Sequence, residues 1–235
     1  MKSLLRRLGT WRSGWLQPNP RDGPAESPRP RSPLLIVVEG PHDVAFLKRI
    51  SALLHRQNPD LPDLGRAESE GRIMFLPAGG GNLWSWPHRL APLSLQEIHI
   101  YDRELSPATE QRQQLVDAIN ARPRCRAVLT CKRALENYLH SLAVLQAGGV
   151  KIEFTDDDAV PQLVAQAVYR TLGTDVPWAD LSHRARKRRC ERAKVWLNTR
   201  AVECMTPELL QQRDPDGEIA GWLSTIAGLM ADAAD

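Results

Sequence analysis

The apolar positions of the chain fall first into a short continuous run and then into helical spacing. Residues 34–38 read Leu-Leu-Ile-Val-Val, which is typical of a strand that is buried on both faces. Gly40 allows a tight turn, and Pro41 suits a first helical position, where its missing N–H costs nothing. Apolar residues then recur at helical spacing from Phe46 to Leu54. The pattern predicts a strand that leads directly into a helix.

Similar alternation continues along the chain. Further apolar runs predict strands at residues 73–76, 98–101 and 127–130. Helical spacing predicts helices at residues 109–121, 131–139, 159–172 and 216–231. Strands that alternate with helices favour a parallel sheet covered on both faces. We therefore expect an α/β fold, with a Rossmann-like parallel sheet flanked by helices and a C-terminal helical extension.

Composition divides the chain into three regions. Residues 1–33 are rich in arginine and proline, so we expect a disordered basic leader. A basic arm for nucleic acid, an organelle presequence and a start codon set too early all fit this leader. Residues 34–145 carry the predicted strands and form the expected α/β domain. Residues 146–235 form the expected helical extension.

Overall composition is that of a soluble globular protein, with 42% hydrophobic and 25% charged residues in 235. The net charge of +3 is too small to indicate a polyanion partner by itself. No apolar run approaches the ~20 residues that span a bilayer, so no membrane is expected. The cysteines form no CxxC pair and have no histidine at zinc spacing, which predicts free thiols in a reducing cytoplasm.

Acidic residues stand where two predicted strands end. Glu39 ends the first strand, and Asp43 lies in the first turn of the following helix. Asp102 and Glu104 end the third strand, and two residues this far apart on an extended chain point the same way. The carboxyl ends of parallel strands form the edge where ligands bind. A solvated cap would explain one such residue, but two acidic strand ends favour a cation site.

The segment after the fourth strand adds a further acid and a cation. Glu136 lies near the carboxyl end of that strand, and Lys132 precedes it by four residues. A surface pair at this spacing is the alternative explanation. If the strand end reaches the acidic edge, Glu136 is a metal ligand and Lys132 is a candidate catalytic cation.

Residues 183–194 form the strongest basic cluster of the chain. Its candidate nucleic-acid contacts are Arg184, Arg186, Lys187, Arg188, Arg189 and Arg192. Such a run is often only a solvated helix face. In a chain with a predicted phosphate-handling edge, contact with nucleic acid is the better interpretation.

The order of these motifs resembles the TOPRIM fold of topoisomerases, primases and nucleases of the OLD (overcoming lysogenization defect) family. The resemblance rests on the strand with Glu39-Gly-x-x-Asp43, the strand followed by Gly79-Gly80, and the strand with Asp102-x-Glu104. The segment 132–139, Lys-Arg-Ala-Leu-Glu-Asn-Tyr-Leu, is most similar to the OLD branch. The resemblance to the TOPRIM fold covers roughly residues 34–140. The chain departs from the usual Asp-x-Asp by having Asp102-x-Glu104.

The resemblance implies a metal-dependent nuclease. Phosphodiester cleavage benefits from Mg²⁺ or Mn²⁺, which carboxylate oxygens bind well. The implied ligands are Glu39, Asp43, Asp102, Glu104 and Glu136, with Glu39 also catalytic. OLD-type nucleases draw a lysine from a helix beyond the sheet, and residues 192–197 resemble that helix. Lys194 is therefore the second candidate for the catalytic cation.

The resemblance also implies partners. Nucleic acid, with DNA favoured, is the expected substrate. Residues 1–33 are too short to supply the ATPase domain that usually precedes this module in OLD proteins, so a separate ATPase or a second copy of the chain is expected. A primase-like nucleotidyl transferase or an RNA-maturing nuclease would use the same carboxylates. A non-catalytic module that binds a separate ATPase or nucleic acid is the alternative from another class.

Overall fold

The computed structural model describes residues 32–79, 83–173 and 175–232, so nearly all of the predicted leader lies outside the described residues. Residues 31–235 belong to one compact unit. Its described residues contain a four-stranded parallel sheet with the order β2-β1-β3-β4. The strands are β1 (Leu34–Val38), β2 (Ile73–Pro77), β3 (Glu97–Tyr101) and β4 (Cys125–Leu129). The predicted α/β fold with a parallel sheet is confirmed.

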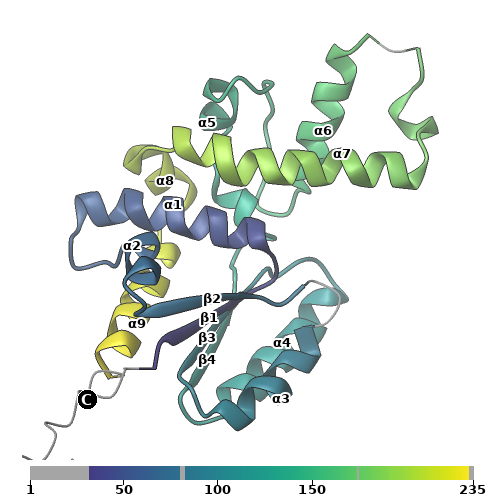
Figure 1. Ribbon diagram of the computed structural model, residues 1–235. Helices are drawn as coiled ribbons and strands as arrows, with labels where there is room; N and C mark the ends of the chain where they lie inside the picture. The colour runs from purple at the N-terminus through teal and green to yellow at the C-terminus, as the bar shows by residue number, and fades with distance from the viewer. Residues whose placement is uncertain (1–31, 80–82, 174, 233–235) are drawn as a thin grey trace, which may run out of the picture. The chain divides into compact units, whose positions relative to one another are not determined.

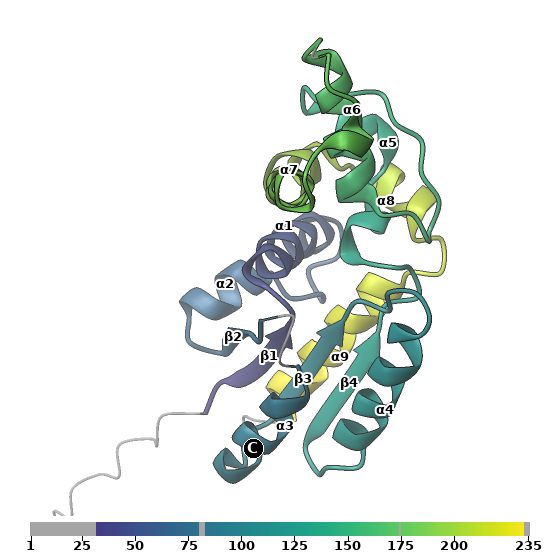
Figure 2. The same ribbon diagram turned by 90° about the vertical axis from the view of Figure 1, so that its right-hand side faces the viewer.

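Helices cover both faces of this sheet (Figures 1 and 2). They are α1 (Pro41–Gln57), α2 (Leu64–Ser69), α3 (Trp86–Leu90), α4 (Ala108–Asn120), α5 (Ser141–Gln146), α6 (Val160–Thr171), α7 (His183–Trp196), α8 (Pro207–Arg213) and α9 (Glu218–Asp232). On one face, Ile36 of β1 shares an apolar cluster with α1 and α9. On the other face, Val37 packs with α4. Of the helices described, none has the length and apolar character needed to cross a membrane.

Strand β1 is buried on both faces, as its run of five aliphatic residues predicts. Each of its side chains is at most 3% exposed. Burial of a large aliphatic side chain stabilises the fold by about 1.5–3 kcal/mol. This strand is therefore fixed between two helical layers, and it holds Glu39 and the start of α1 at the carboxyl edge of the sheet.

The helices after residue 146 share a core with the sheet. Val164 of α6 and Trp222 of α9 belong to the same apolar cluster as Ile36 and Ile98. Helix α7 lies over α1 in both views (Figures 1 and 2). The predicted extension is thus packed against the α/β part, and α7 is carried to the edge of the sheet where β1 ends.

The prediction of a helix over residues 131–139 is wrong. A loop follows β4, and only a short 3₁₀ turn, Leu135–Tyr138, forms there. The backbone N–H groups of this loop have other acceptors, since Arg133 donates to the Asp156 carbonyl at 2.8 Å and Leu135 donates to Asp102 Oδ1 at 3.0 Å. These long-range bonds replace the i to i−4 bonds that a helix needs.

Candidate functional site

The acidic ends of β1 and β3 lie at the same edge of the sheet. Strands β1 and β3 are neighbours, and the backbone N–H of Asp102 donates to Glu39 Oε1 at 3.0 Å. Glu39 is therefore fixed against the backbone that follows β3. The strand order places the two predicted residues next to each other, as parallel topology requires.

Glu39 is also paired with Arg112 of α4. Arg112 Nη2 donates to Glu39 Oε2 at 3.0 Å, and Nη1 donates to Oε1 and, at 2.5 Å, to the Asp102 carbonyl. Bidentate contacts of this kind are strong and specific in direction. Sequence reasoning missed Arg112, whose one signal is its place in the helix that follows the acidic end of β3.

Lys194 of α7 lies among three carboxylates from three different parts of the chain. Its Nζ is 3.4 Å from Asp43 Oδ1, 3.6 Å from Glu136 Oε1 and 3.9 Å from Asp102 Oδ2. We call Asp43, Asp102 and Glu136 the carboxylate cluster. All three are at most 4% exposed, whereas the Lys194 side chain is 27% exposed. The ammonium therefore lies against the buried cluster, on a side chain that is itself partly exposed.

Each member of the carboxylate cluster is also held by a neighbouring N–H group. Asp43 Oδ2 accepts from the Gly40 backbone at 2.8 Å, so this residue does serve the start of α1. Asp102 Oδ1 accepts from the Leu135 backbone at 3.0 Å. Asp43 Oδ1 is buried and has no hydrogen bond among the described residues, so its contact with Lys194 is an ion pair alone. Hydrogen bonds therefore hold the carboxylate cluster in position, but one of its buried oxygens lacks a hydrogen-bond donor among the described residues.

In the carboxylate cluster, three acidic groups lie around one ammonium, so acidic groups outnumber basic ones there. Burial raises the pKa of Asp102 well above its ordinary value; Lys194 opposes the rise, while Asp43, Glu136 and Glu104 add to it. Burial alone would lower the pKa of Lys194, but attraction by Glu136, Asp102 and Asp43 raises it above its ordinary value. Lys194 therefore stays protonated, and Asp102 binds a proton more readily than an exposed aspartate does.

Asn198 holds Glu136 beside Lys194. Its Nδ2 donates to Glu136 Oε1 at 2.6 Å, and its side chain is fully buried. Asn198 belongs to a π-helical turn, Leu197–Ala201, that continues α7. Turns of this type are frequent at functional sites. Sequence reasoning missed Asn198, although a polar residue four positions after Lys194, within an apolar stripe, was an available signal.

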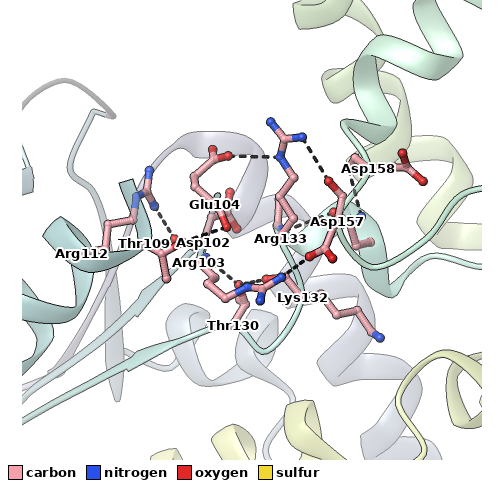
Figure 3. Close-up of polar contacts among 12 residues, drawn as sticks. Asp102, Arg103, Glu104, Thr109, Arg112, Thr130, Lys132, Arg133, Asp157 and Asp158 are labelled. Atoms are coloured by element: carbon pink, nitrogen blue, oxygen red, sulfur yellow. Dashed lines mark hydrogen bonds and ion pairs between the residues drawn. The ribbon is translucent and has the colours of Figure 1, made fainter. Parts of the chain in front are cut away.

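Glu104 does not join the carboxylate cluster. Its φ of +58° lies in the left-handed region, which is uncommon for a residue other than glycine. The backbone therefore turns after Asp102, and Glu104 Oε2 faces Arg133 Nε at 3.3 Å (Figure 3). The expectation that Asp102 and Glu104 point the same way fails because the chain is not extended between them.

Lys132 also lies apart from the cluster. Its Nζ is 2.7 Å from Asp156 Oδ2 and 5.4 Å from the centre of the Tyr138 ring. In Figure 3 its side chain extends away from Asp102 and Glu104. Of the two predicted cations, the structure brings only Lys194 to the carboxylates, because the loop after β4 directs Lys132 toward Asp156.

The basic residues of α7 fall on different sides of the helix. Lys187 stands two turns before Lys194 and shares its face. Arg184, Arg188 and Arg192 follow one another in steps of four, so they share a second face, and all three are exposed. Of these four residues, only Lys187 shares the helix face of Lys194.

The two remaining basic residues of α7, Arg186 and Arg189, lie nearer α6. The Arg189 guanidinium is 5.0 Å from the centre of the Tyr169 ring. Arg186 is half-buried and lines a hollow that also includes Trp178. Part of the basic charge of α7 is thus engaged in helix packing, so the run does not form a single binding surface.

The donor chemistry of the cluster suits a hard divalent cation. Carboxylate oxygens are the preferred ligands of Mg²⁺ and Mn²⁺, and Asp43 Oδ1 is a buried oxygen without a hydrogen bond to any described residue. In the present arrangement, no three acidic, histidine or cysteine side chains among the described residues are placed to hold one ion together. The Lys194 ammonium occupies the point on which the three carboxylates converge. Asp43, Asp102 and Glu136 would be the ligands of a metal bound here.

The residues of this site come from four separate segments of the chain, and its closest contacts join α1, the end of β3, the 3₁₀ turn and α7. Such an arrangement, with buried carboxylates and one cation at the carboxyl edge of a parallel sheet, is typical of a functional site. The resemblance to the TOPRIM fold stays a prediction. Comparisons with protein-family models, with curated proteins and with solved structures found no match for the chain.

Proposed function

We propose that this chain is a Mg²⁺- or Mn²⁺-dependent nuclease whose active site is the carboxylate cluster with Lys194. The observation that carries the proposal is the Lys194 ammonium lying within 3.9 Å of three buried carboxylates. Burying several like charges around one counter-ion is unfavourable for the fold. Shifted pKa values of buried carboxylates and a cation beside them are common at functional sites, and Asp102 and Lys194 both show such shifts.

The metal would be held by Asp43, Asp102 and Glu136, with Glu39 supporting the same edge through Asp102 and Arg112. When bound, such an ion activates water and neutralises charge that develops on the phosphate. Glu39 and Arg112 fix the backbone of Asp102, because both contact it directly. Asn198 fixes the carboxylate of Glu136 in the same way.

Lys194 would supply the cation that stabilises negative charge on the phosphate in the transition state. Its neighbours keep it protonated, and its side chain is 27% exposed, so Lys194 lies between the buried carboxylates and the protein surface. A preorganised donor of this kind contributes about 3 kcal/mol to transition-state stabilisation. Lys132, which is held by Asp156, takes no part in this step.

Nucleic acid would approach along the face of α7 that carries Lys194. Lys187 lies on this face and is exposed, so it is placed to contact a backbone phosphate. The other face of α7 carries Arg184, Arg188 and Arg192. These arginines would contact nucleic acid only if the nucleic acid wraps around α7. DNA remains the favoured substrate, with RNA as the alternative.

A non-catalytic module is the second candidate, and one observation favours it. Lys194 neutralises part of the cluster without any metal, so the same contacts could simply join α7 to the sheet. Such a module would bind nucleic acid, or a separate ATPase, without cleaving a bond. The two candidates differ in whether loss of a carboxylate removes activity or only weakens packing.

The test is incubation of the purified chain with plasmid, single-stranded DNA or RNA, each with Mn²⁺, Mg²⁺ or EDTA. We expect cleavage with a metal and none with EDTA. Glu39→Ala and Asp102→Asn should abolish cleavage while the circular dichroism spectrum stays that of the wild type. Lys132→Ala is the matched control for Lys194→Ala, and it should retain cleavage. No metal-dependent cleavage of any substrate by the wild-type chain would support the binding module instead.

A further inference from the structure

A second site lies on the other side of α7, between this helix and α6. A cavity of about 400 Å³ opens there, which is within the range of small-molecule sites. Its walls are mainly apolar and include Val164, Val168 and Leu172 of the α6 region and Trp196 of α7. Val168 and Leu172 are 42% and 60% exposed, so apolar surface is left open to solvent at its mouth.

The wall formed by Trp196 is held in place by the chain opposite. A Cβ added at Gly149 would lie 2.5 Å from the Trp196 ring and 2.6 Å from the Val144 carbonyl. The ring therefore packs directly against a backbone that only glycine allows. The fixed indole of Trp196 bounds the cavity on one side. Because this ring has little room to move, the cavity is a preformed site and does not close by movement of the ring.

Arginines of α7 form one wall of the same cavity. Arg188, Arg189 and Arg192 line it, and Arg189 is engaged with the Tyr169 ring. The ion pairs found among the described residues include no carboxylate partner for Arg188 or Arg192. Both are exposed. Two guanidinium groups without a carboxylate partner in the described part of the chain, beside an apolar cavity, are suited to a ligand with an anionic group and an apolar body.

We propose that the α6–α7 cavity binds an amphiphilic anion, with the apolar body between Val164, Val168 and Trp196 and the anionic group at Arg188 and Arg192. A nucleobase fits less well, because its polar edges would meet aliphatic walls without hydrogen-bond partners. A free alkyl carboxylate and the acyl chain of an anionic lipid share the required chemistry. The site is distinct from the carboxylate cluster, because Lys194 lies on the opposite face of α7.

The experiment is titration calorimetry of the full chain with decanoate, compared with its neutral analogue decanol. Decanoate should bind saturably at roughly 0.1 mM, and at least tenfold more tightly than decanol. The double variant Arg188→Gln/Arg192→Gln should weaken decanoate binding about tenfold and leave decanol binding unchanged. Val168→Glu should remove binding of both, because it places a carboxylate among the apolar walls. Arg184→Gln, on the same face but outside the cavity, should leave decanoate binding within twofold.

A parallel arm uses sedimentation with phosphatidylglycerol vesicles and with neutral phosphatidylcholine vesicles. Binding of decanoate in solution assigns the cavity to a free amphiphile, and binding to phosphatidylglycerol vesicles alone assigns it to a lipid acyl chain. The proposal is overturned if neither ligand binds, if decanol binds as tightly as decanoate, or if the arginine variant binds decanoate normally. These measurements need neither nucleic acid nor a metal, so their failure is separable from failure of the nuclease proposal.

Discussion

Strand β3 begins with the buried carboxylate of Glu97 and is followed directly by that of Asp102, and the two carboxylates have opposite surroundings. Glu97 at its start accepts hydrogen bonds on both oxygens, from Arg122 at 2.9 and 3.1 Å and from His99 at 2.9 Å. Burial opposes its ionisation, but His99 and Arg122 together lower the pKa of Glu97 below its ordinary value. At the other end, burial raises the pKa of Asp102, which shares one ammonium with two other acids.

The difference separates a buried carboxylate that is fully paired from one that is paired incompletely. Both oxygens of Glu97 already accept hydrogen bonds, so its charge is stabilised and its oxygens are not available to bind a ligand. The carboxylate cluster has too few partners, so a bound cation or proton would lower its energy. We infer that the amino end of β3 supports the fold and that the carboxyl end is the reactive one.

Among the basic residues, Lys194→Ala should produce the largest change in activity. Turnover should fall at least about 100-fold, since the preorganised cation is lost, whereas nucleic-acid affinity should change less than about threefold. Single-turnover cleavage and equilibrium binding with a metal-free chain separate the two quantities. Turnover within threefold of the wild type would return Lys194 to a packing role.

Arg122→Met should produce the largest change in stability, at the other end of β3. Glu97 is 1% exposed, and its side chain would be left buried with a single partner. We expect the free energy of unfolding to fall by about 3 kcal/mol, measured by urea denaturation. Cleavage by the folded fraction should be unchanged. A loss well under 1 kcal/mol would mean that Glu97 is not held as the hydrogen bonds indicate.

The two ends should also respond oppositely to pH. Because the pKa of Glu97 is lowered, its stabilisation is complete above the ordinary value of 4.5 and is lost as the pH falls through the folded value. Because the pKa of Asp102 is raised, its contribution becomes unfavourable as the pH rises from 3.8 through the folded value. Asp102→Asn should therefore raise the free energy of unfolding at pH 7.

Urea unfolding at intervals from pH 3 to pH 8 measures both effects. Asp102→Asn should gain stability over the wild type as the pH rises, whereas Glu97→Gln should lose stability over the same interval. If Asp102→Asn is less stable than the wild type at pH 7, the carboxylate is favourably paired and the contrast along β3 disappears.

Lys187→Ala should give the smallest effect. The variant should bind nucleic acid a few-fold more weakly, and the slope of log affinity against log salt should fall by about 1. Arg200→Ala is a suitable control, since Arg200 is 72% exposed and lies beyond the end of α7. Equal slopes for the two variants would place the nucleic acid on another face.

The sequence was informative where a local pattern determines the structure. Five aliphatic residues predicted β1, and parallel topology then placed Glu39 and Asp102 at one edge. The expected position of Lys194 over the carboxylates agrees with the structure, while its role in turnover stays a prediction.

Long-range partners could not be predicted in the same way. Arg112 meets Glu39 across 73 positions and Asn198 meets Glu136 across 62, and neither pair has a local signature. The left-handed backbone at Glu104 and the loop after β4 depend on contacts with Arg133 and Asp156. The sequence pattern therefore identified the edge of the sheet but overestimated how many acidic residues share one site there.

The most direct test compares cleavage by Asp102→Asn and Glu97→Gln, with Mn²⁺ present and rates divided by the folded fraction. Both substitutions remove one buried negative charge from an end of β3, and both keep a similar side-chain shape. We predict that Asp102→Asn cleaves at least about 100-fold more slowly than the wild type and that Glu97→Gln cleaves at the wild-type rate. Equal rates for the two folded variants would contradict the assignment of the carboxylate cluster as the active site.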